Sequence, residues 1–221
     1  MCGVIGVSLR DATESDITLV RNIFLQSMIR GKHATGVTYR KGGKLHTIKK
    51  PISADQFMEE HSVEDWVDRN DLHLIGHIRY STSDLRYNQP FTNGRTSIAH
   101  NGVISQDPNI WEYETETKND SELILRCLEA GDDPLDKYKH RSMAVVGLSI
   151  TALFAYRNPE RPLWRSERNN GAVFASTQDI LKRSGLEGLH RCESMVKYSY
   201  EPCGLTIDKK HFDKSLEDLQ P

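Results

Sequence analysis

A helix with apolar residues on one face is predicted for residues 15–30. Its apolar residues recur at the three- and four-residue spacing that places side chains on a single face: Leu19, Val20, Ile23, Phe24 and Met28. Such a helix is stable mainly when that face is buried against another element. The strand-like segment Gly3–Leu9 precedes it, so we expect a layer of helix packed over a sheet.

The other segments alternate between strand-like and helix-like patterns, with no internal repeat and no low-complexity linker. Gly42-Gly43 lies at the turn of a predicted hairpin formed by residues 37–39 and 45–48. The apolar run over residues 145–156 is typical of a buried strand. Further strands are predicted over Leu72–Arg79, 96–100 and 173–176, and helices over 54–69, 121–130 and 178–184.

Cys2 follows an initiator methionine, which is normally removed when the next residue is small. Removal leaves one residue that carries both a thiol and a free α-amine. The pKa of an α-amine is about 7.7 to 8.0 and that of a thiol about 8.5, so near neutral pH the amine is partly unprotonated and can take the thiol proton. We therefore expect Cys2 to be an N-terminal nucleophile that supplies its own base.

Six short segments occur in a set order along the chain. They are Cys2-Gly3-Val4-Ile5-Gly6, Arg30-Gly31-Lys32-His33-Ala34-Thr35-Gly36, Gly76-His77-Ile78-Arg79-Tyr80-Ser81-Thr82, Gln89-Pro90-Phe91, Ala99-His100-Asn101-Gly102 and Asn119-Asp120-Ser121-Glu122. Together they resemble the glutaminase domain of the class II glutamine amidotransferases, which are N-terminal nucleophile enzymes. The third and fourth segments are most similar to the amidophosphoribosyltransferase branch of that family.

The resemblance implies an α+β fold, the four-layer αββα sandwich in which two antiparallel sheets lie between helices. Periodicity alone does not distinguish this sandwich from another mixed fold. We expect the glutaminase domain to cover residues 2–200, with an unassigned C-terminal extension at 201–221 that includes extended chain and a short charged helix over 209–220.

Asn101 and Gly102 are candidate oxyanion donors. A thiolate that attacks the side-chain amide of glutamine creates an oxyanion, which needs hydrogen-bond donors aimed at it. Asn101 offers a side-chain N–H and Gly102 a backbone N–H, and glycine lets the main chain approach closely. The alternative is an ordinary turn, because Asn-Gly is a common two-residue hairpin sequence.

Arg79 and Asp120 are candidate anchors for the two charged groups of free glutamine. The planar guanidinium of Arg79 suits the α-carboxylate, since it binds two oxygens at once and stays charged. The resemblance implies that Asp120 binds the α-ammonium of glutamine. The alternative roles are structural: Arg79 ends a strand at the surface, and Asp120 caps the helix that follows.

Arg30 and Tyr80 complete the predicted substrate-binding residues, on the resemblance alone. The chain departs from the usual family pattern at two positions, since it has His33 where Asp is most common and Tyr80 where the hexosamine branch has Trp. His33 weakens the inference for the Arg30 loop, so Arg30 is a secondary candidate. A closing loop over residues 80–91 is a reasonable gate.

Composition excludes several classes of function. A chain of 221 residues permits one sizeable domain. Its formal charge of -2, with 29 Lys and Arg against 31 Asp and Glu, gives no basic field for nucleic-acid binding. No apolar segment is long enough to span a bilayer and the start lacks a secretory pattern, so we expect a cytoplasmic protein.

The sequence indicates no cofactor and no metal. It contains no phosphate-cradling glycine loop and no His/Glu pair at metal-binding helical spacing. Cys127, Cys192 and Cys203 have no Cys-x-x-Cys partner, so we interpret them as structural thiols rather than zinc ligands.

These observations predict hydrolysis of the L-glutamine side-chain amide to glutamate and ammonia through a Cys2 thioester. Familiar family members join this domain to a synthase, for which 221 residues leave no room, so we expect a separate ammonia-accepting synthase subunit or a glutaminase that acts alone. Two alternatives remain open: an N-terminal nucleophile hydrolase of another γ-glutamyl amide, and a catalytically silent binding module of the same fold.

Overall fold

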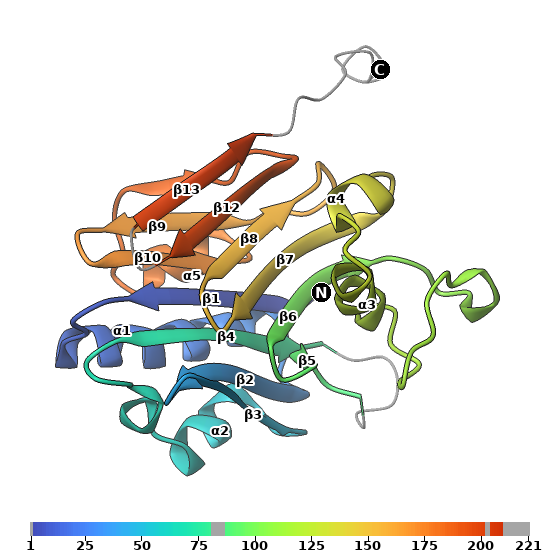
Figure 1. The fold of residues 1–221 in the computed structure, drawn as a ribbon. Coiled ribbons are helices and arrows are strands. Elements are labelled where there is room, and N and C mark those ends of the chain that lie inside the picture. The colour runs from blue at the N-terminus through green and yellow to red at the C-terminus, as the bar shows by residue number, and fades with distance from the viewer. Residues whose placement is uncertain (1, 81–86, 202–203, 210–221) are drawn as a thin grey trace.

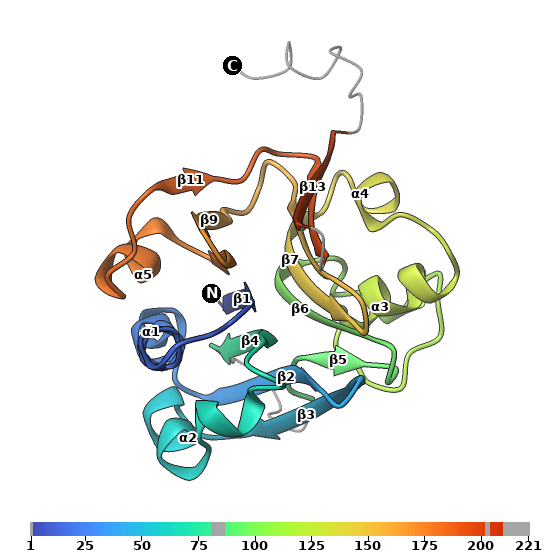
Figure 2. The ribbon, with the colours of Figure 1, turned by 60° about the vertical axis from the view of Figure 1, so that its left-hand side comes forward.

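The computed structural model describes residues 2–80, 87–201 and 204–209. Within them the chain forms two β-sheets that lie face to face, with helices on both outer faces (Figures 1 and 2). All strand pairs in both sheets are antiparallel. The predicted α+β fold class, the αββα sandwich, is therefore confirmed.

The first sheet has seven strands in the order β11-β9-β10-β1-β4-β2-β3. Their bounds are β1 Gly3–Leu9, β2 Ala34–Lys41, β3 Lys44–Lys50, β4 Leu72–Arg79, β9 Trp164–Arg168, β10 Gly171–Ala175 and β11 Leu189–Arg191. In the register of β1 and β4, Gly3 is opposite Ile78 and Leu9 is opposite Leu72. This register places Cys2 beside the end of β4, where Arg79 stands.

The second sheet has six strands in the order β13-β12-β8-β7-β6-β5. Their bounds are β5 Phe91–Thr92, β6 Thr96–Val103, β7 Ser142–Ser149, β8 Leu153–Arg157, β12 Val196–Glu201 and β13 Gly204–Lys209. Strand β6 pairs with β7 along its whole length, so that Asn101 is opposite Ala144 and Gly102 is opposite Met143.

The helices form the two outer layers (Figure 2). The first sheet is covered by α1 (Glu14–Gln26), α2 (Ala54–Glu60) and α5 (Gln178–Arg183), and the second by α3 (Glu122–Glu129) and α4 (Pro134–Lys137). Short 3-10 turns are η1 (Ser27–Arg30), η2 (Val63–Trp66) and η3 (Pro108–Ile110). Helix α1 begins at a capping box, in which Asp16 N donates to Thr13 Oγ1 at 3.3 Å and Thr13 N donates to Asp16 Oδ2 at 3.0 Å.

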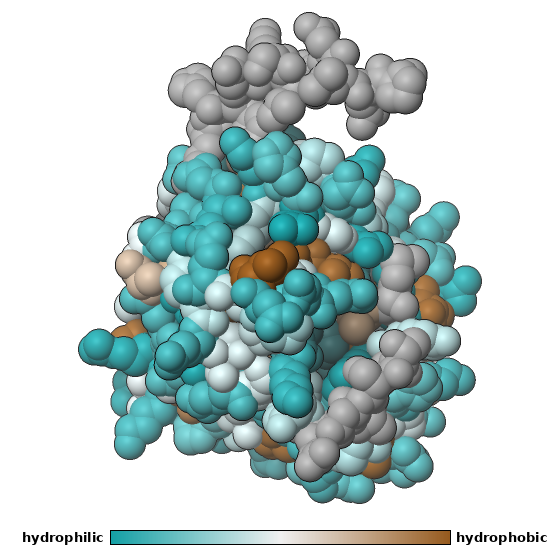
Figure 3. Space-filling view, turned by 90° about the vertical axis from the view of Figure 1, so that its right-hand side faces the viewer, coloured by the Kyte–Doolittle hydropathy of each residue, from teal (hydrophilic) through white to brown (hydrophobic). Residues whose placement is uncertain are grey.

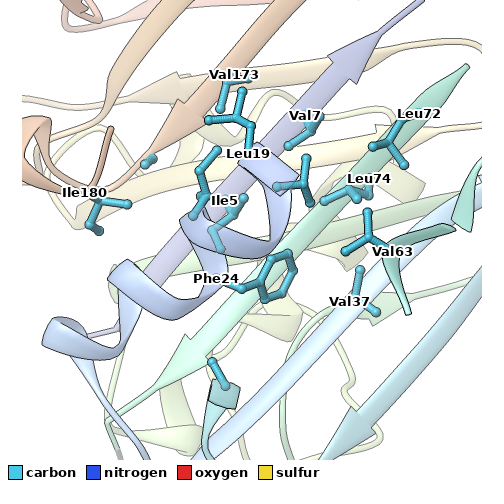
Figure 4. Close-up of a cluster of buried hydrophobic side chains, with 14 of the residues drawn as sticks. Ile5, Val7, Leu19, Phe24, Val37, Val63, Leu72, Leu74, Val173 and Ile180 are labelled. Carbon is cyan, nitrogen blue, oxygen red and sulfur yellow. The ribbon is translucent and has the colours of Figure 1, made fainter. Parts of the chain in front are cut away.

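Helix α1, which was predicted from its single apolar face, packs over the first sheet as expected. Leu19 and Phe24 of α1 belong to one buried cluster with Ile5 and Val7 of β1 and Leu74 of β4 (Figure 4). Burying such side chains stabilises the fold by roughly 1.5–3 kcal/mol each. This cluster therefore fixes helix α1 against the outer face of the first sheet.

A second apolar core fills the space between the two sheets. Successive side chains of a strand point to opposite faces, so Val4 of β1 enters this core while Ile5 and Val7 face the helices. Burial on both faces explains why β1 is apolar almost throughout. Ile75 of β4 and Ala99 of β6 also belong to the core between the sheets.

Residues 145–156 form two strands, so the prediction of a single strand there was wrong. The strands β7 and β8 are joined by a turn in which Ser149 Oγ accepts hydrogen bonds from the backbone N–H groups of Thr151 and Ala152 at 3.2 and 2.9 Å. The apolar pattern hid this turn because Ile150, which lies in it, is 41% exposed but continues the hydrophobic run.

Two predicted helices are shorter than expected. Helix α1 ends at Gln26 and continues as the 3-10 turn η1. Helix α2 ends at Glu60, because His61 has extended backbone with φ -132° and ψ 126°, and the separate turn η2 follows. In both regions the apolar spacing continues past the helix end, which is why the sequence pattern extended the helices.

The predicted C-terminal extension contributes one strand, β13, which pairs with β12. Residues 202–203 and 210–221, including most of the helix predicted over 209–220, lie outside the described residues. The described part of the chain contains no helix long and apolar enough to cross a membrane.

Candidate active site

One cleft of about 520 Å³ collects residues from both sheets and from the start of α3. Five of the predicted site residues line it: Cys2, Arg79, Tyr80, Gly102 and Asp120. Figure 3 shows the side of the molecule that carries α3, where the surface is mostly polar and an apolar patch near the centre lies beside a hollow.

The strand pattern explains why these residues meet. Positions two apart on a strand share a face. Cys2 therefore lies on the same side of β1 as Val4, and Asn101 lies on the same side of β6 as Ala99, both toward the gap between the sheets. His77 and Arg79 follow Ile75 on that side of β4. The polar residues thus stand where the apolar core between the sheets ends.

Cys2 is a free, partly exposed cysteine directly before β1. Its Sγ lies 3.9 Å from the carbonyl oxygen of Tyr80. The guanidinium Nε of Arg30 donates to the carbonyl oxygen of Cys2 at 3.3 Å. Arg30, the last residue of η1, therefore fixes the backbone of Cys2, while Cys2 itself lines the cleft.

Asn101 and Gly102 lie within β6, which excludes the hairpin-turn alternative. Asn101 is 2% exposed, and its buried Nδ2 has no hydrogen-bond partner among the residues that the structure describes. Gly102 has φ +157°, and a Cβ there would lie 1.8 Å from the carbonyl oxygen of Ser142. Only glycine fits at position 102, and Asn101 keeps an unused donor beside it.

Arg79 is 8% exposed, which rules out the alternative of a solvated strand end. Its Nη1 donates to the carbonyl oxygen of Tyr87 at 3.1 Å and to Asn88 Oδ1 at 2.7 Å. These contacts fix the guanidinium at the cleft wall, which suits recognition of a planar carboxylate.

Asp120 is not the helix cap that one alternative predicted. The N-cap of α3 is Ser121. The Asp120 Oδ2 instead accepts hydrogen bonds from the backbone N–H groups of Ile104 and Ser105 at 2.6 and 3.1 Å. No described residue hydrogen bonds to its Oδ1, so one carboxylate oxygen holds the chain and the other is available at the cleft.

Arg30 is not among the residues that line the cleft, in contrast to Tyr80. The η1 turn approaches the end of β4 closely, because a Cβ at Gly31 would lie 2.4 Å from backbone atoms of Arg79 and Tyr80. His33, where the chain departs from the family pattern, has its ring centroid 5.2 Å from that of Tyr80. Ser81 and Thr82, with half of the predicted gate, lie outside the described residues, which resume at Tyr87.

Sequence reasoning gave no role to His77, Gln89, His100 or Ser121, although all four line the cleft. Burial is the main cause that lowers the pKa of His77 to about 3, with the charge of Arg79 as a second cause. Burial also lowers the pKa of His100. Both imidazoles are therefore neutral at pH 7. All four residues occur in the six quoted segments, so the sequence marked their positions. It gave no indication of which residues they contact.

Cys127 and Cys192 are buried and are not among the residues that line the cleft. Burial raises the pKa of Cys127 to about 11 and that of Cys192 to about 12, so neither is a thiolate at neutral pH. Cys203 lies outside the described residues. In residues 2–80, 87–201 and 204–209, no three His, Cys, Asp or Glu side chains converge as metal ligands.

Two solved structures share this fold at 21% sequence identity. The glutamine phosphoribosylpyrophosphate amidotransferase from B. subtilis matches 96% of this chain with a TM-score of 0.74. The allosteric regulatory enzyme of purine biosynthesis matches 96% with a TM-score of 0.75. This chain has the class II glutamine amidotransferase fold. It spans about half the length of each, since 50% of each of those chains is covered.

A shorter protein has the same fold over its whole length. The glutamine aminotransferase class-II domain protein from Silicibacter pomeroyi matches 95% of this chain and 99% of its own, with a TM-score of 0.56 and 10% identity. No family model matches the sequence, and no curated protein matches it. The resemblance inferred from the six segments is confirmed at the level of the fold.

Proposed function

We propose that this domain hydrolyses the side-chain amide of L-glutamine to glutamate and ammonia, with Cys2 as the nucleophile. The observation that carries the proposal is one cleft in which a free thiol, a buried arginine and an aspartate meet beside the Asn101–Gly102 pair. A thiol needs an oxyanion site, and a free amino acid needs a cation and an anion to hold its two charged groups.

The proposed reaction begins once Met1 has been removed, when the α-amine of Cys2 takes the thiol proton. The thiolate attacks the carboxamide carbon, and the N–H groups of Asn101 and Gly102 stabilise the oxyanion. The protonated α-amine returns the proton to the departing nitrogen, so ammonia leaves as the C–N bond breaks. Water then hydrolyses the γ-glutamyl thioester, which gives glutamate and restores the thiol.

The two substrate anchors have geometric support. Arg79 is held at the cleft wall by Tyr87 and Asn88, which suits the α-carboxylate of glutamine. Asp120 has one carboxylate oxygen engaged by backbone donors, and the other suits the α-ammonium. Tyr80 lines the mouth of the cleft. Arg30 instead helps to position the nucleophile, because its guanidinium donates a hydrogen bond to the Cys2 carbonyl oxygen.

Labelling with an electrophilic glutamine analogue tests the proposal. Intact mass followed by peptide mapping should show a chain without Met1 and a single adduct on Cys2, blocked by excess glutamine. Cys127 and Cys192 serve as internal controls, because their buried thiols should stay unlabelled. Retained Met1 with no adduct would support the catalytically silent module instead.

Comparing glutamine with γ-glutamyl dipeptides separates the proposed substrate from other γ-glutamyl amides. Arg79 and Asp120 together favour the free amino acid. Faster turnover of the dipeptides would assign the cleft to an N-terminal nucleophile hydrolase of another amide.

We further propose that the ammonia passes to a separate synthase. The B. subtilis amidotransferase and the allosteric regulatory enzyme of purine biosynthesis are each about twice as long as the region they share with this chain, which supports an acceptor activity outside the glutaminase fold. Glutaminase activity measured with and without co-purifying proteins tests this. Full activity of the isolated chain with no associated protein would contradict it.

A further inference from the structure

Three buried polar side chains form a hydrogen-bonded cluster next to the Asn101–Gly102 pair. They are Gln89, which precedes β5, His100 on β6, and Ser121 at the start of α3, with exposed fractions of 5%, 1% and 3%. Burying a polar group lowers the stability of the fold unless the group is hydrogen-bonded, so the donors and acceptors of these three side chains are expected to be paired.

The hydrogen bonds of the cluster fit one direction of donation. Gln89 Oε1 accepts from the backbone N–H of His100 at 2.6 Å, and Gln89 Nε2 donates to the His100 carbonyl oxygen at 3.2 Å and to Ser121 Oγ at 3.0 Å. Ser121 Oγ then has its own proton to donate to His100 Nδ1, 2.9 Å away. His100 Nε2 lies 3.2 Å from the carbonyl oxygen of Ser142 and donates to it. His100 is thus assigned as the neutral Nε2–H tautomer.

The end of β6 and the start of α3 are joined at two points that flank the candidate oxyanion donors. Before Asn101, His100 is bonded to Ser121. After Gly102, the backbone N–H groups of Ile104 and Ser105 are bonded to Asp120, the residue next to Ser121. The segment that carries the oxyanion donors is therefore fixed on both sides to the segment that carries the candidate ammonium anchor.

The His100 ring also lies against Gly102 itself. A Cβ at position 102 would lie 2.6 Å from His100 Nε2. A change in the orientation of this ring therefore changes the space available to the Gly102 main chain, whose N–H is a candidate oxyanion donor.

We propose that Ser121 is a positioning residue that, through His100, couples the binding of an α-ammonium at Asp120 to the alignment of the oxyanion donors. This inference rests on the proposed glutaminase function. Ser121 itself need not touch the substrate. Its hydroxyl fixes the His100 ring, and the backbone connects it directly to the carboxylate that binds the ammonium. A substrate with its ammonium in place thereby favours the reactive arrangement of Asn101 and Gly102.

The test compares glutamine with glutaramate, which is glutamine without the α-amine, on the full chain. In the wild-type protein glutamine should have the higher kcat, by about tenfold, in addition to a lower KM. In Ser121→Ala, kcat for glutamine should fall about tenfold toward the value for glutaramate, while kcat for glutaramate changes little. The kcat ratio of the two substrates should therefore approach one.

Ser97→Ala is the matched control. Ser97 is a buried serine on β6 that does not line the cleft. Its Oγ donates to the Phe91 carbonyl oxygen at 3.1 Å and lies 2.9 Å from Thr38 Oγ1. Its loss should leave the kcat ratio unchanged. Equal losses of kcat for both substrates in Ser121→Ala would mean a merely structural role and overturn the inference.

Ser121→Thr provides a second variant that retains the hydroxyl. It should keep the wild-type kcat ratio, and loss of that ratio would also overturn the inference. These failures are distinct from failure of the proposed function, in which the wild-type protein would hydrolyse neither substrate and form no Cys2 adduct.

Discussion

His73 and His77 lie on the same strand, β4, and face the same gap between the sheets, but their surroundings differ. His73 Nδ1 is 3.0 Å from Ser8 Oγ, and its Nε2 is 3.8 Å from Asp71 Oδ2. His77 lines the cleft with Cys2, and no described residue hydrogen bonds to its buried Nε2. Burial lowers the pKa of both, to about 4 for His73 and about 3 for His77.

The difference fits the proposal that the Cys2 end of the gap binds substrate, whereas the His73 end stabilises the fold. Around His73 the fold itself supplies a hydrogen-bond partner, Ser8, and a nearby carboxylate, Asp71. Around Cys2, the buried Asn101 Nδ2 and His77 Nε2 lack partners within the described chain. An unsatisfied buried polar group costs about 1–3 kcal/mol, so groups left in this state are expected where a substrate supplies the missing partner.

The largest expected effect contrasts Cys2→Ala, directly before β1, with Ser8→Ala, near the other end of that strand. Cys2→Ala should abolish glutamine turnover, because it removes the nucleophile, and should change the free energy of unfolding little. Ser8→Ala should leave turnover unchanged and lower the free energy of unfolding by about 1 kcal/mol, because His73 loses a partner.

Steady-state glutaminase assays and urea unfolding measure both quantities on both variants. Full turnover by Cys2→Ala would remove the proposed mechanism. Lost turnover in a stably folded Ser8→Ala protein would show that the two ends of the gap are not functionally distinct.

The next effect concerns Asn101. Asn101→Ala should lower kcat by about 100- to 1000-fold, the loss typical of one oxyanion donor. Loss of its Nδ2 breaks no hydrogen bond within the described residues, so Tm should change less than in Ser8→Ala. Turnover within a fewfold of wild type would mean that Asn101 does not contact the oxyanion.

A smaller effect is expected for Asp120→Asn. The amide oxygen can still accept from Ile104 and Ser105, so the local structure is retained while the charge is lost. KM for glutamine should rise by about tenfold or more, since a charge-assisted contact to the ammonium is weakened. Substrate saturation curves measure this, with glutaramate as the control substrate. An unchanged KM for glutamine would contradict the assignment.

The layers of the fold and the β2–β3 hairpin with its Gly42-Gly43 turn were predictable, and the β7–β8 connection was not. The strands Gly3–Leu9 and Leu72–Arg79 were predicted with their observed bounds, because apolar runs bounded by polar residues mark buried strands. The β7–β8 turn was missed because an exposed isoleucine continues the apolar run there. Periodicity reports burial, and where both faces of neighbouring strands are buried it gives no sign of a reversal.

For the candidate site, the sequence predicted the reactive groups but not their supports. Cys2, Asn101 and Arg79 were named from their chemistry and from the resemblance. The contacts of Gln89 and Ser121 with His100 were not predictable, because these residues lie 11 and 21 positions away and become its neighbours only when β5 pairs with β6 and α3 packs on β6. A hydrogen-bond cluster of this kind is a product of the tertiary structure.

The smallest expected effect returns to the two histidines and concerns stability between pH 7 and 5. The ordinary pKa of 6.5 holds in the unfolded chain, whereas the folded values are about 4 for His73 and about 3 for His77. Between pH 6.5 and the folded-state pKa, each imidazole is therefore protonated in the unfolded chain but neutral in the folded protein. Each histidine thus lowers the free energy of unfolding by up to about 1.4 kcal/mol per unit fall in pH.

Replacing each histidine by glutamine sharpens the comparison. Both His73→Gln and His77→Gln should flatten the pH dependence of urea unfolding in this range, because each removes one group that binds a proton on unfolding. At pH 7, however, only His73→Gln should lower stability, by about 1 kcal/mol, since it alone disturbs the contact with Ser8. If His77→Gln is the more destabilising variant at pH 7, His77 supports the fold as His73 does, and its free nitrogen does not mark a substrate site.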